Sequence, residues 1–111
     1  MDVLFDNSDL REECNDSRLL RRRHNVHRAK LIRRRLDDLS AVPSLETMRS
    51  LPGRCHELVG KRKLQLSVDL DGPYRLLFRP INEPIPVRAE GGLDWANVTA
   101  VSVIGIVDTH D

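Results

Sequence analysis

Apolar residues in the first forty positions recur at helix-type spacing. Asn7 and Ser8 are favourable helix N-cap residues, and Leu10, Cys14 and Leu20 after them can share one helix face. Asn25 can close this helix or cap the next one. In the next segment, apolar residues three or four positions apart form one stripe, and arginines lie on the other side. The residues of the stripe are Val26, Ala29, Ile32, Leu36 and Leu39. The pattern predicts a short strand at 3–5 and two helices, the second ending at Pro43.

The pattern changes to strand-type alternation after the break at Leu51-Pro52-Gly53. Residues 64–70 alternate apolar and polar, which predicts a half-buried antiparallel strand. A turn at 71–73 leads to a returning strand at 74–79, in which Arg75 points away from Tyr74. Residues 80–92 are rich in Pro and Gly and predict a long loop, and 98–107 is apolar enough for a central strand covered on both faces. We therefore expect one α+β domain over residues 1–111.

Charge and composition narrow the class of protein. The net charge is only +1, but nine Lys and Arg residues lie between Arg18 and Arg35 without one carboxylate, which predicts a basic face. No apolar run approaches the roughly 20 residues of a membrane span, and the first residues are acidic, unlike a signal peptide. The two cysteines form no CxxC pair. These features predict a cytoplasmic protein that does not bind membranes.

Three segments resemble a known toxin family. They are LPGRCHEL at 51–58, SVDL at 67–70 followed by YRLLF at 74–78, and VDTH at 107–110. Their order and spacing are similar to those of HigB, the proteic killer branch of the RelE/ParE toxin superfamily. The resemblance implies a RelE-like fold, with a small twisted antiparallel sheet packed against two N-terminal helices.

The same resemblance implies an activity and partners. It points to the toxin of a type II toxin–antitoxin system, an mRNA interferase that inhibits translation by cutting mRNA in the ribosomal A site without metal or any other cofactor. The implied partners are the ribosome, mRNA and a HigA-like helix-turn-helix antitoxin. Thr109 departs from the family's usual Asp-Tyr-His motif and removes an aromatic ring that could stack on a nucleotide. Leu64 replaces a glycine that is common after the basic run.

Metal-free RNA cleavage needs a base for the 2′-hydroxyl proton, a cation at the phosphoryl oxygens and an acid for the departing 5′-oxygen. His56 and His110 suit proton transfer, and which one is acid and which base stays open. Arg75 is our candidate for the charge clamp. Asp108 can orient a histidine. Candidate contacts to the RNA backbone are Lys61, Arg62, Lys63, Arg79, Arg22 and Arg34.

Each assignment has a structural alternative. His56 can be a satisfied structural histidine, Arg75 a surface arginine, and the basic helices a solvated face. His24 and His27 lack a third ligand, so we assign no metal. The shortage of aromatic residues favours a nuclease that depends on the ribosome to present RNA. The open alternatives are a catalytically weak or inactive toxin-fold protein that serves as an antitoxin- or RNA-binding module, and a small transcription regulator.

Overall fold

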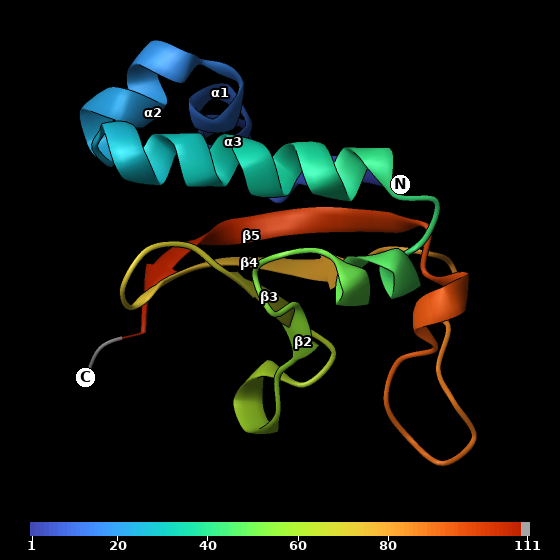
Figure 1. Cartoon of the computed structure of the whole chain (residues 1–111). Helices are drawn as coiled ribbons and strands as arrows, with labels where there is room; N and C mark the ends of the chain where they lie inside the picture. Colours follow the sequence, from blue (N-terminus) through green and yellow to red (C-terminus); the bar gives the residue numbers. More distant parts are fainter. Residues whose placement is uncertain (110–111) are drawn as a thin grey trace.

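The computed structural model describes residues 1–109, which form a five-stranded sheet with helices on one face (Figure 1). The strand order is β1-β5-β4-β3-β2. The bounds are β1 Asp2–Phe5, β2 His56–Glu57, β3 Leu66–Asp69, β4 Tyr74–Pro80 and β5 Ala100–Asp108. The expected α+β class is confirmed.

The sheet is mixed rather than antiparallel throughout. β1 pairs with β5 in parallel, with Asp2 opposite Ala100, whereas β2, β3, β4 and β5 pair antiparallel in series. An apolar tripeptide such as Val3–Phe5 indicates a strand but does not indicate which strand it pairs with. That pairing depends on the path that the chain takes through the helices before it reaches the other strands. Phe5 pairs with Val103, and β5 continues to Asp108 without β1 beside it. The expectation that β5 is covered on both faces fits only its first half, since 104–107 are half exposed.

Three α-helices, instead of the two expected, lie between β1 and the rest of the sheet in the chain. They are α1 Ser8–Asn15, α2 Ser17–Arg23 and α3 Val26–Ala41. The expected first helix breaks at Asp16, whose carboxylate accepts hydrogen bonds from the backbone N–H groups of Arg18 and Leu19. Aspartate is more favourable at a helix N-cap than in a helix interior, so Asp16 starts a new helix. Asn7 and Asn25 cap α1 and α3, as expected.

Helix α3 buries most of its expected stripe. Ala29, Ile32, Leu36 and Leu39 are all buried, but Val26 is 54% exposed and Arg35 only 9% exposed, which corrects the predicted division between apolar and basic sides. With about 100° between successive residues, Val26 and Arg35 lie at opposite borders of the stripe. Arg35 tolerates burial because its Nε donates to the backbone oxygen of Asp69 at 2.9 Å.

The helices cover the sheet face that carries the main core, which includes Val68, Leu76, Phe78 and Val103. Alternate residues therefore point to the opposite face, which the α-helices leave uncovered (Figure 1). Among residues 1–109, no helix combines the length and the apolar character that a membrane crossing requires.

Candidate functional site

The face of the sheet opposite the helices carries a hollow of about 530 Å³, which we call the open-face hollow. It brings together segments that are far apart in sequence. Its lining consists of Arg54, His56, Leu58, Arg62, Ser67, Arg75, Leu77, Val107, Asp108 and Thr109. Three of the four proposed catalytic residues are in this set.

The strand register explains why these side chains meet. His56 on β2 lies opposite Ser67 on β3, which lies opposite Leu77 on β4. One step along, Asp69 lies opposite Arg75, which in turn lies opposite Val107 on β5. Because cross-strand partners share a face, these two rows form one surface. Ser67 and Leu77 are only 2% exposed and lie at the base of the hollow.

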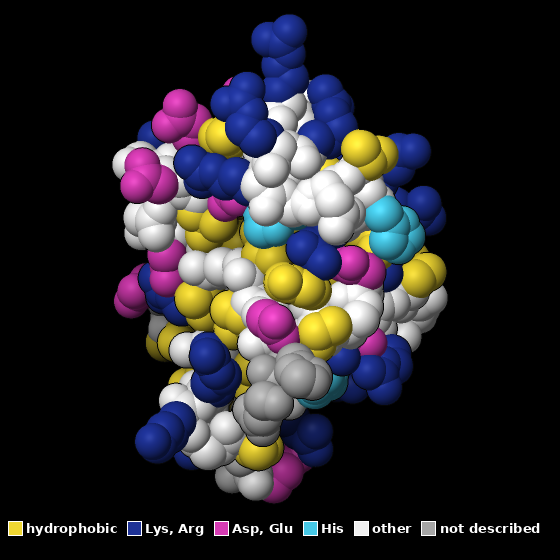
Figure 2. All heavy atoms as spheres, turned by 90° about the vertical axis from the view of Figure 1, so that its left-hand side faces the viewer, with side chains coloured by type: hydrophobic (Ala, Val, Ile, Leu, Met, Phe, Trp, Pro, Cys, Tyr) yellow, Lys and Arg dark blue, Asp and Glu magenta, His cyan; other side chains and the backbone are white. Residues whose placement is uncertain are grey.

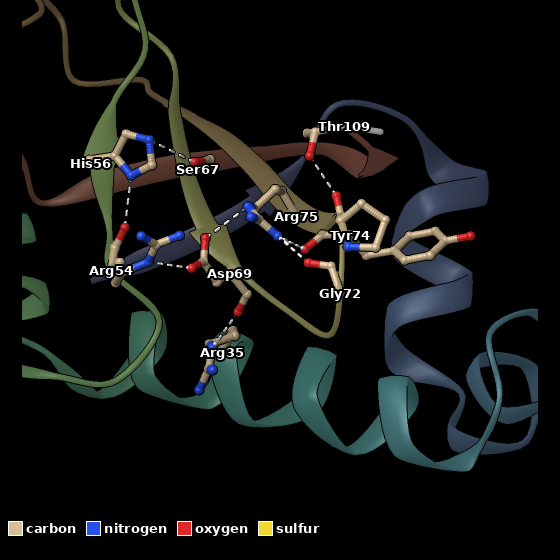
Figure 3. A network of polar contacts seen from close by, with 10 residues as sticks. Arg35, Arg54, His56, Ser67, Asp69, Gly72, Tyr74, Arg75 and Thr109 are labelled. Atoms are coloured by element: carbon tan, nitrogen blue, oxygen red, sulfur yellow. Dashed lines mark hydrogen bonds and ion pairs between the residues drawn. The ribbon is translucent and has the colours of Figure 1, made fainter. Parts of the chain in front are cut away.

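The ring of His56 is oriented by one backbone carbonyl and one side-chain hydroxyl. Its Nδ1 lies 2.8 Å from the carbonyl oxygen of Arg54, and its Nε2 lies 3.5 Å from the hydroxyl of Ser67 (Figure 3). A carbonyl oxygen can only accept, so Nδ1 carries a proton. In the neutral ring the lone pair is then on Nε2. The arrangement is that of a histidine poised to accept a proton at Nε2.

Arg75 is anchored rather than free. Its Nε lies 2.8 Å from Asp69 Oδ1, and its Nη1 donates to the carbonyl oxygens of Gly72 and Tyr74 (Figure 3). Its side chain is 20% exposed. It points away from Tyr74's ring, as the alternation predicts. The guanidinium that we proposed as the charge clamp is thus held in a fixed position in the lining of the hollow.

Arg54 is a cation that the sequence analysis did not single out. Its Nε donates to Asp69 Oδ2 at 2.6 Å, and 76% of its side chain is exposed. Gly53 and Arg54 both have positive φ, 112° and 48°, so the chain turns sharply before β2. The available signal was the position of Arg54 within LPGRCHEL, two residues before His56.

The C-terminal segment reaches the hollow through Asp108 and Thr109. The backbone N–H and the hydroxyl of Thr109 both donate to the carbonyl oxygen of Pro73, at 2.9 and 2.7 Å. This places Thr109 against the β3–β4 turn (Figure 3). His110 lies outside the described residues. The role of Asp108 in orienting a histidine stays a prediction.

The proposed RNA-backbone cations separate into three places. Arg62 lines the hollow, while Lys61 and Lys63 are exposed on the same turn but outside the lining. Leu64 follows this turn with a positive φ of 69°. Arg79 bonds Asp6, whose pKa is lowered first by the hydroxyl of Ser102 and also by Arg79.

Arg22 and Arg34 project from helices on the other face, where Lys and Arg side chains gather over the helical layer (Figure 2). The predicted basic face is partly neutralised. Five of its nine cations have partners: Arg23 with Glu13, Arg28 with Asp71, Arg33 with Asp37, Arg34 with Asp38, and Arg35 with the Asp69 carbonyl. Within residues 1–109, Arg18, Arg21, Arg22 and Lys30 have exposed side chains without an ion pair.

Neither cysteine belongs to the hollow. Burial raises the pKa of the Cys14 and Cys55 thiols to about 12, which keeps both protonated near neutral pH. His24, considered above as a metal ligand, instead contacts Glu13 Oε1 at 2.8 Å. Across residues 1–109, three or more His, Cys, Asp or Glu side chains do not gather into a metal-binding group.

Searches of protein-family models and of curated proteins returned no match to this chain.

Proposed function

We propose that this chain is a cytoplasmic type II toxin of the RelE/HigB kind, a metal-independent mRNA endoribonuclease that acts on the ribosome. The observation that supports the proposal is the convergence of His56, Arg54, Arg62, Arg75 and Asp108 in one hollow. A base, several phosphate-binding cations and a carboxylate are the groups that metal-free RNA cleavage requires. The proposal also includes a HigA-like antitoxin as partner.

The chemistry follows from the orientation of each group. Nε2 of His56 takes the proton of the 2′-hydroxyl, whose oxygen attacks the adjacent phosphorus. Arg75 and Arg54 stabilise the charge on the non-bridging oxygens as the bond to the 5′-oxygen breaks. The products are a 2′,3′-cyclic phosphate and a 5′-hydroxyl. His110 is our candidate for the acid that protonates the departing 5′-oxygen, which leaves His56 as the base.

The surroundings of the hollow favour dependence on the ribosome. Its described lining contains no Phe, Tyr or Trp side chain. Phe78 and Trp95 are buried, and the guanidinium of Arg28 lies 3.4 Å from the centre of the Tyr74 ring. Proteins that bind single-stranded RNA unaided commonly stack bases on exposed aromatic rings. A site without such rings needs a partner to present the RNA, and the ribosome does this in the RelE family.

The decisive experiment combines expression with mapping of cleavage. Expression of the chain alone should arrest growth, and purified protein should cut mRNA only on programmed ribosomes. Arg75→Ala should abolish both effects while the variant stays folded and still binds the antitoxin. Equal cleavage of naked RNA would contradict ribosome dependence, and loss of activity in EDTA with intact ribosomes, restored by zinc, would contradict a metal-independent mechanism.

One observation favours a second candidate, a toxin-fold protein with weak or no activity that binds RNA or an antitoxin. Thr109 replaces the tyrosine of relatives and is bonded to Pro73 instead of facing an RNA base. This candidate predicts that the chain binds its partner but neither arrests growth nor cuts mRNA. Thr109→Tyr should then strengthen or restore cleavage if the missing ring is the cause.

A further inference from the structure

Asp69 lies between two of the arginines that line the open-face hollow, Arg54 and Arg75. Its Oδ2 accepts a hydrogen bond from Arg54 Nε at 2.6 Å, and its Oδ1 lies 2.8 Å from Arg75 Nε. The second contact is an ion pair rather than an aligned hydrogen bond. The two arginines come from different segments, the turn before β2 and strand β4. One carboxylate therefore joins them (Figure 3).

The backbone of Asp69 is fixed from both sides. Its N–H donates to the carbonyl oxygen of Gly53 at 2.7 Å, and its carbonyl oxygen accepts from the buried Arg35 at 2.9 Å. Asp69 also pairs across the strands with Arg75. The carboxylate position is thus set by the sheet and by α3, and the arginine side chains adjust to it.

Asp69 contacts the Nε edge of each guanidinium and leaves other N–H groups for a ligand. Arg54 and Arg75 line the hollow, whereas Asp69 is outside its lining. Nη1 of Arg75 is bonded to carbonyl oxygens, so its Nη2 is the atom left over, and both Nη atoms of Arg54 remain. The two guanidinium groups therefore reach the hollow, whereas the carboxylate that joins them does not line it.

We propose that Asp69 is a positioning residue that sets Arg54 beside Arg75, so that the two guanidinium groups together grip one phosphate of the RNA. The inference rests on the proposed function and explains how Arg54 and Arg75 are held as two arms of one clamp. The mostly exposed Arg54 side chain would otherwise sample many rotamers, and two neighbouring cations without a shared anion repel each other. Asp69 supplies that anion and preorganises the clamp.

The proposal predicts a change in RNA affinity opposite to the one that the net charge alone predicts. Asp69→Asn removes a negative charge near an RNA site, which by Coulomb attraction alone should tighten RNA binding. If Asp69 positions Arg54, the same change should weaken binding, because an amide cannot bridge two guanidinium groups. Asp37→Asn is the matched control, since it removes the same charge from the exposed surface of α3.

The test uses the full chain and a 2′-O-methyl RNA trinucleotide, which cannot be cleaved, at concentrations high enough to measure the weak binding to phosphate that a clamp gives without the ribosome. Binding is followed by nuclear magnetic resonance. We expect Asp69→Asn and Arg54→Gln each to weaken binding about tenfold, the loss of a charge-assisted contact. Asp37→Asn should leave affinity unchanged or slightly higher. We expect the Arg54 Nε signal to be distinct in the parent protein and to move to the position of a solvent-exposed arginine in Asp69→Asn.

A double-mutant cycle separates positioning from other effects. Adding Arg54→Gln to Asp69→Asn should cost little further affinity, because Arg54 is already released. Unchanged or tighter binding in Asp69→Asn would overturn the proposal. If Asp69→Asn does not fold, unchanged binding in Arg54→Gln would overturn it equally. A parent protein that fails to bind the trinucleotide also overturns the clamp, while its cleavage of mRNA on ribosomes tests the proposed function separately.

Discussion

His56 is oriented by two contacts, and each can be tested through the atom that it constrains. The carbonyl oxygen of Arg54 holds Nδ1, so only Nε2 can accept the 2′-hydroxyl proton. His56→Gln keeps a polar side chain of similar reach but removes the base. We expect ribosome-dependent cleavage to fall between about 100-fold and 10,000-fold, measured in single-turnover assays.

The matched variant for His56 is Ser67→Ala, because Ser67 lies at a marginal 3.5 Å from Nε2 and donates no proton to substrate in this mechanism. It should change the cleavage rate by far less than His56→Gln. Full activity of His56→Gln in a folded protein would place the base elsewhere.

Gly53 precedes Arg54 at a close approach between the turn and the core. A Cβ there would lie 2.5 Å from Val68 Cγ2 and 2.8 Å from Arg35 Nε, and φ is +112°. Gly53→Ala should lower the free energy of unfolding by about 3 kcal/mol, measured by urea denaturation. Gly91 has φ +105° with nothing within 4 Å of a Cβ, so Gly91→Ala should cost only about 1 kcal/mol. Equal losses in the two variants would mean that the contact with Val68 relaxes freely.

At the scale of elements, helix α3 holds the β3–β4 turn through Arg28. Its Nε and Nη2 donate to the two oxygens of Asp71, at 2.8 and 3.0 Å, and its guanidinium covers the ring of Tyr74. The hydrogen bond from Arg28 is the main reason that the pKa of Asp71 lies below its usual value. Because the C-terminal Thr109 bonds Pro73 in the same turn, this ion pair also supports one wall of the hollow.

The lowered pKa of Asp71 gives a pH dependence with a definite sign. A carboxyl whose pKa is lower in the folded state stabilises the fold above its unfolded pKa of about 4, and this contribution is lost as the pH falls through the folded pKa. Asp71→Asn should therefore lower the free energy of unfolding by on the order of 1 kcal/mol at pH 7, and the difference from the parent protein should shrink below pH 4.

Urea denaturation of both proteins across pH 2–7 measures this difference. Asp37→Asn serves as the control, because its exposed pair with Arg33 is screened by solvent and should contribute little at any pH. A difference between the parent and Asp71→Asn that grows as the pH falls would contradict the assigned sign.

On the scale of the whole molecule, the cations on the two sides of the sheet differ in how they are paired with carboxylates. The hollow has arginines arranged around a carboxylate, whereas the helical side has cations without an ion pair, such as Arg22 on α2, beside paired ones such as Arg34. If the helical side contacts ribosomal RNA, Arg22→Ala should weaken ribosome binding and reduce the slope of log affinity against log salt by about 1. Arg34→Ala should have a smaller effect, because Asp38 lies 3.7 Å from its guanidinium. Equal effects of the two substitutions would argue against a phosphate contact by Arg22.

Local pattern was enough to predict most elements of this fold. Helix caps at Asn7 and Asn25, the buried stripe of α3 and the β3–β4 hairpin all depend on residues within a few positions of one another. The α+β class and the orientation of Arg75 away from Tyr74 follow from the same local periodicity. Asp16 could have been identified as a helix start by the same reasoning, since its capping bonds reach only to Leu19.

Only the tertiary structure decided how these elements meet, because the contacts that decide it join segments far apart in the chain. The parallel pairing of β1 with β5 links residues about a hundred positions apart, and the burial of Arg35 depends on a carbonyl of Asp69 across the layers. The sequence by itself determined where most strands and helices form, and it identified the side chains that are candidates for acting on RNA. That one carboxylate joins Arg54 to Arg75 was decided by the sheet register and the sharp turn at Gly53, which no local pattern encodes.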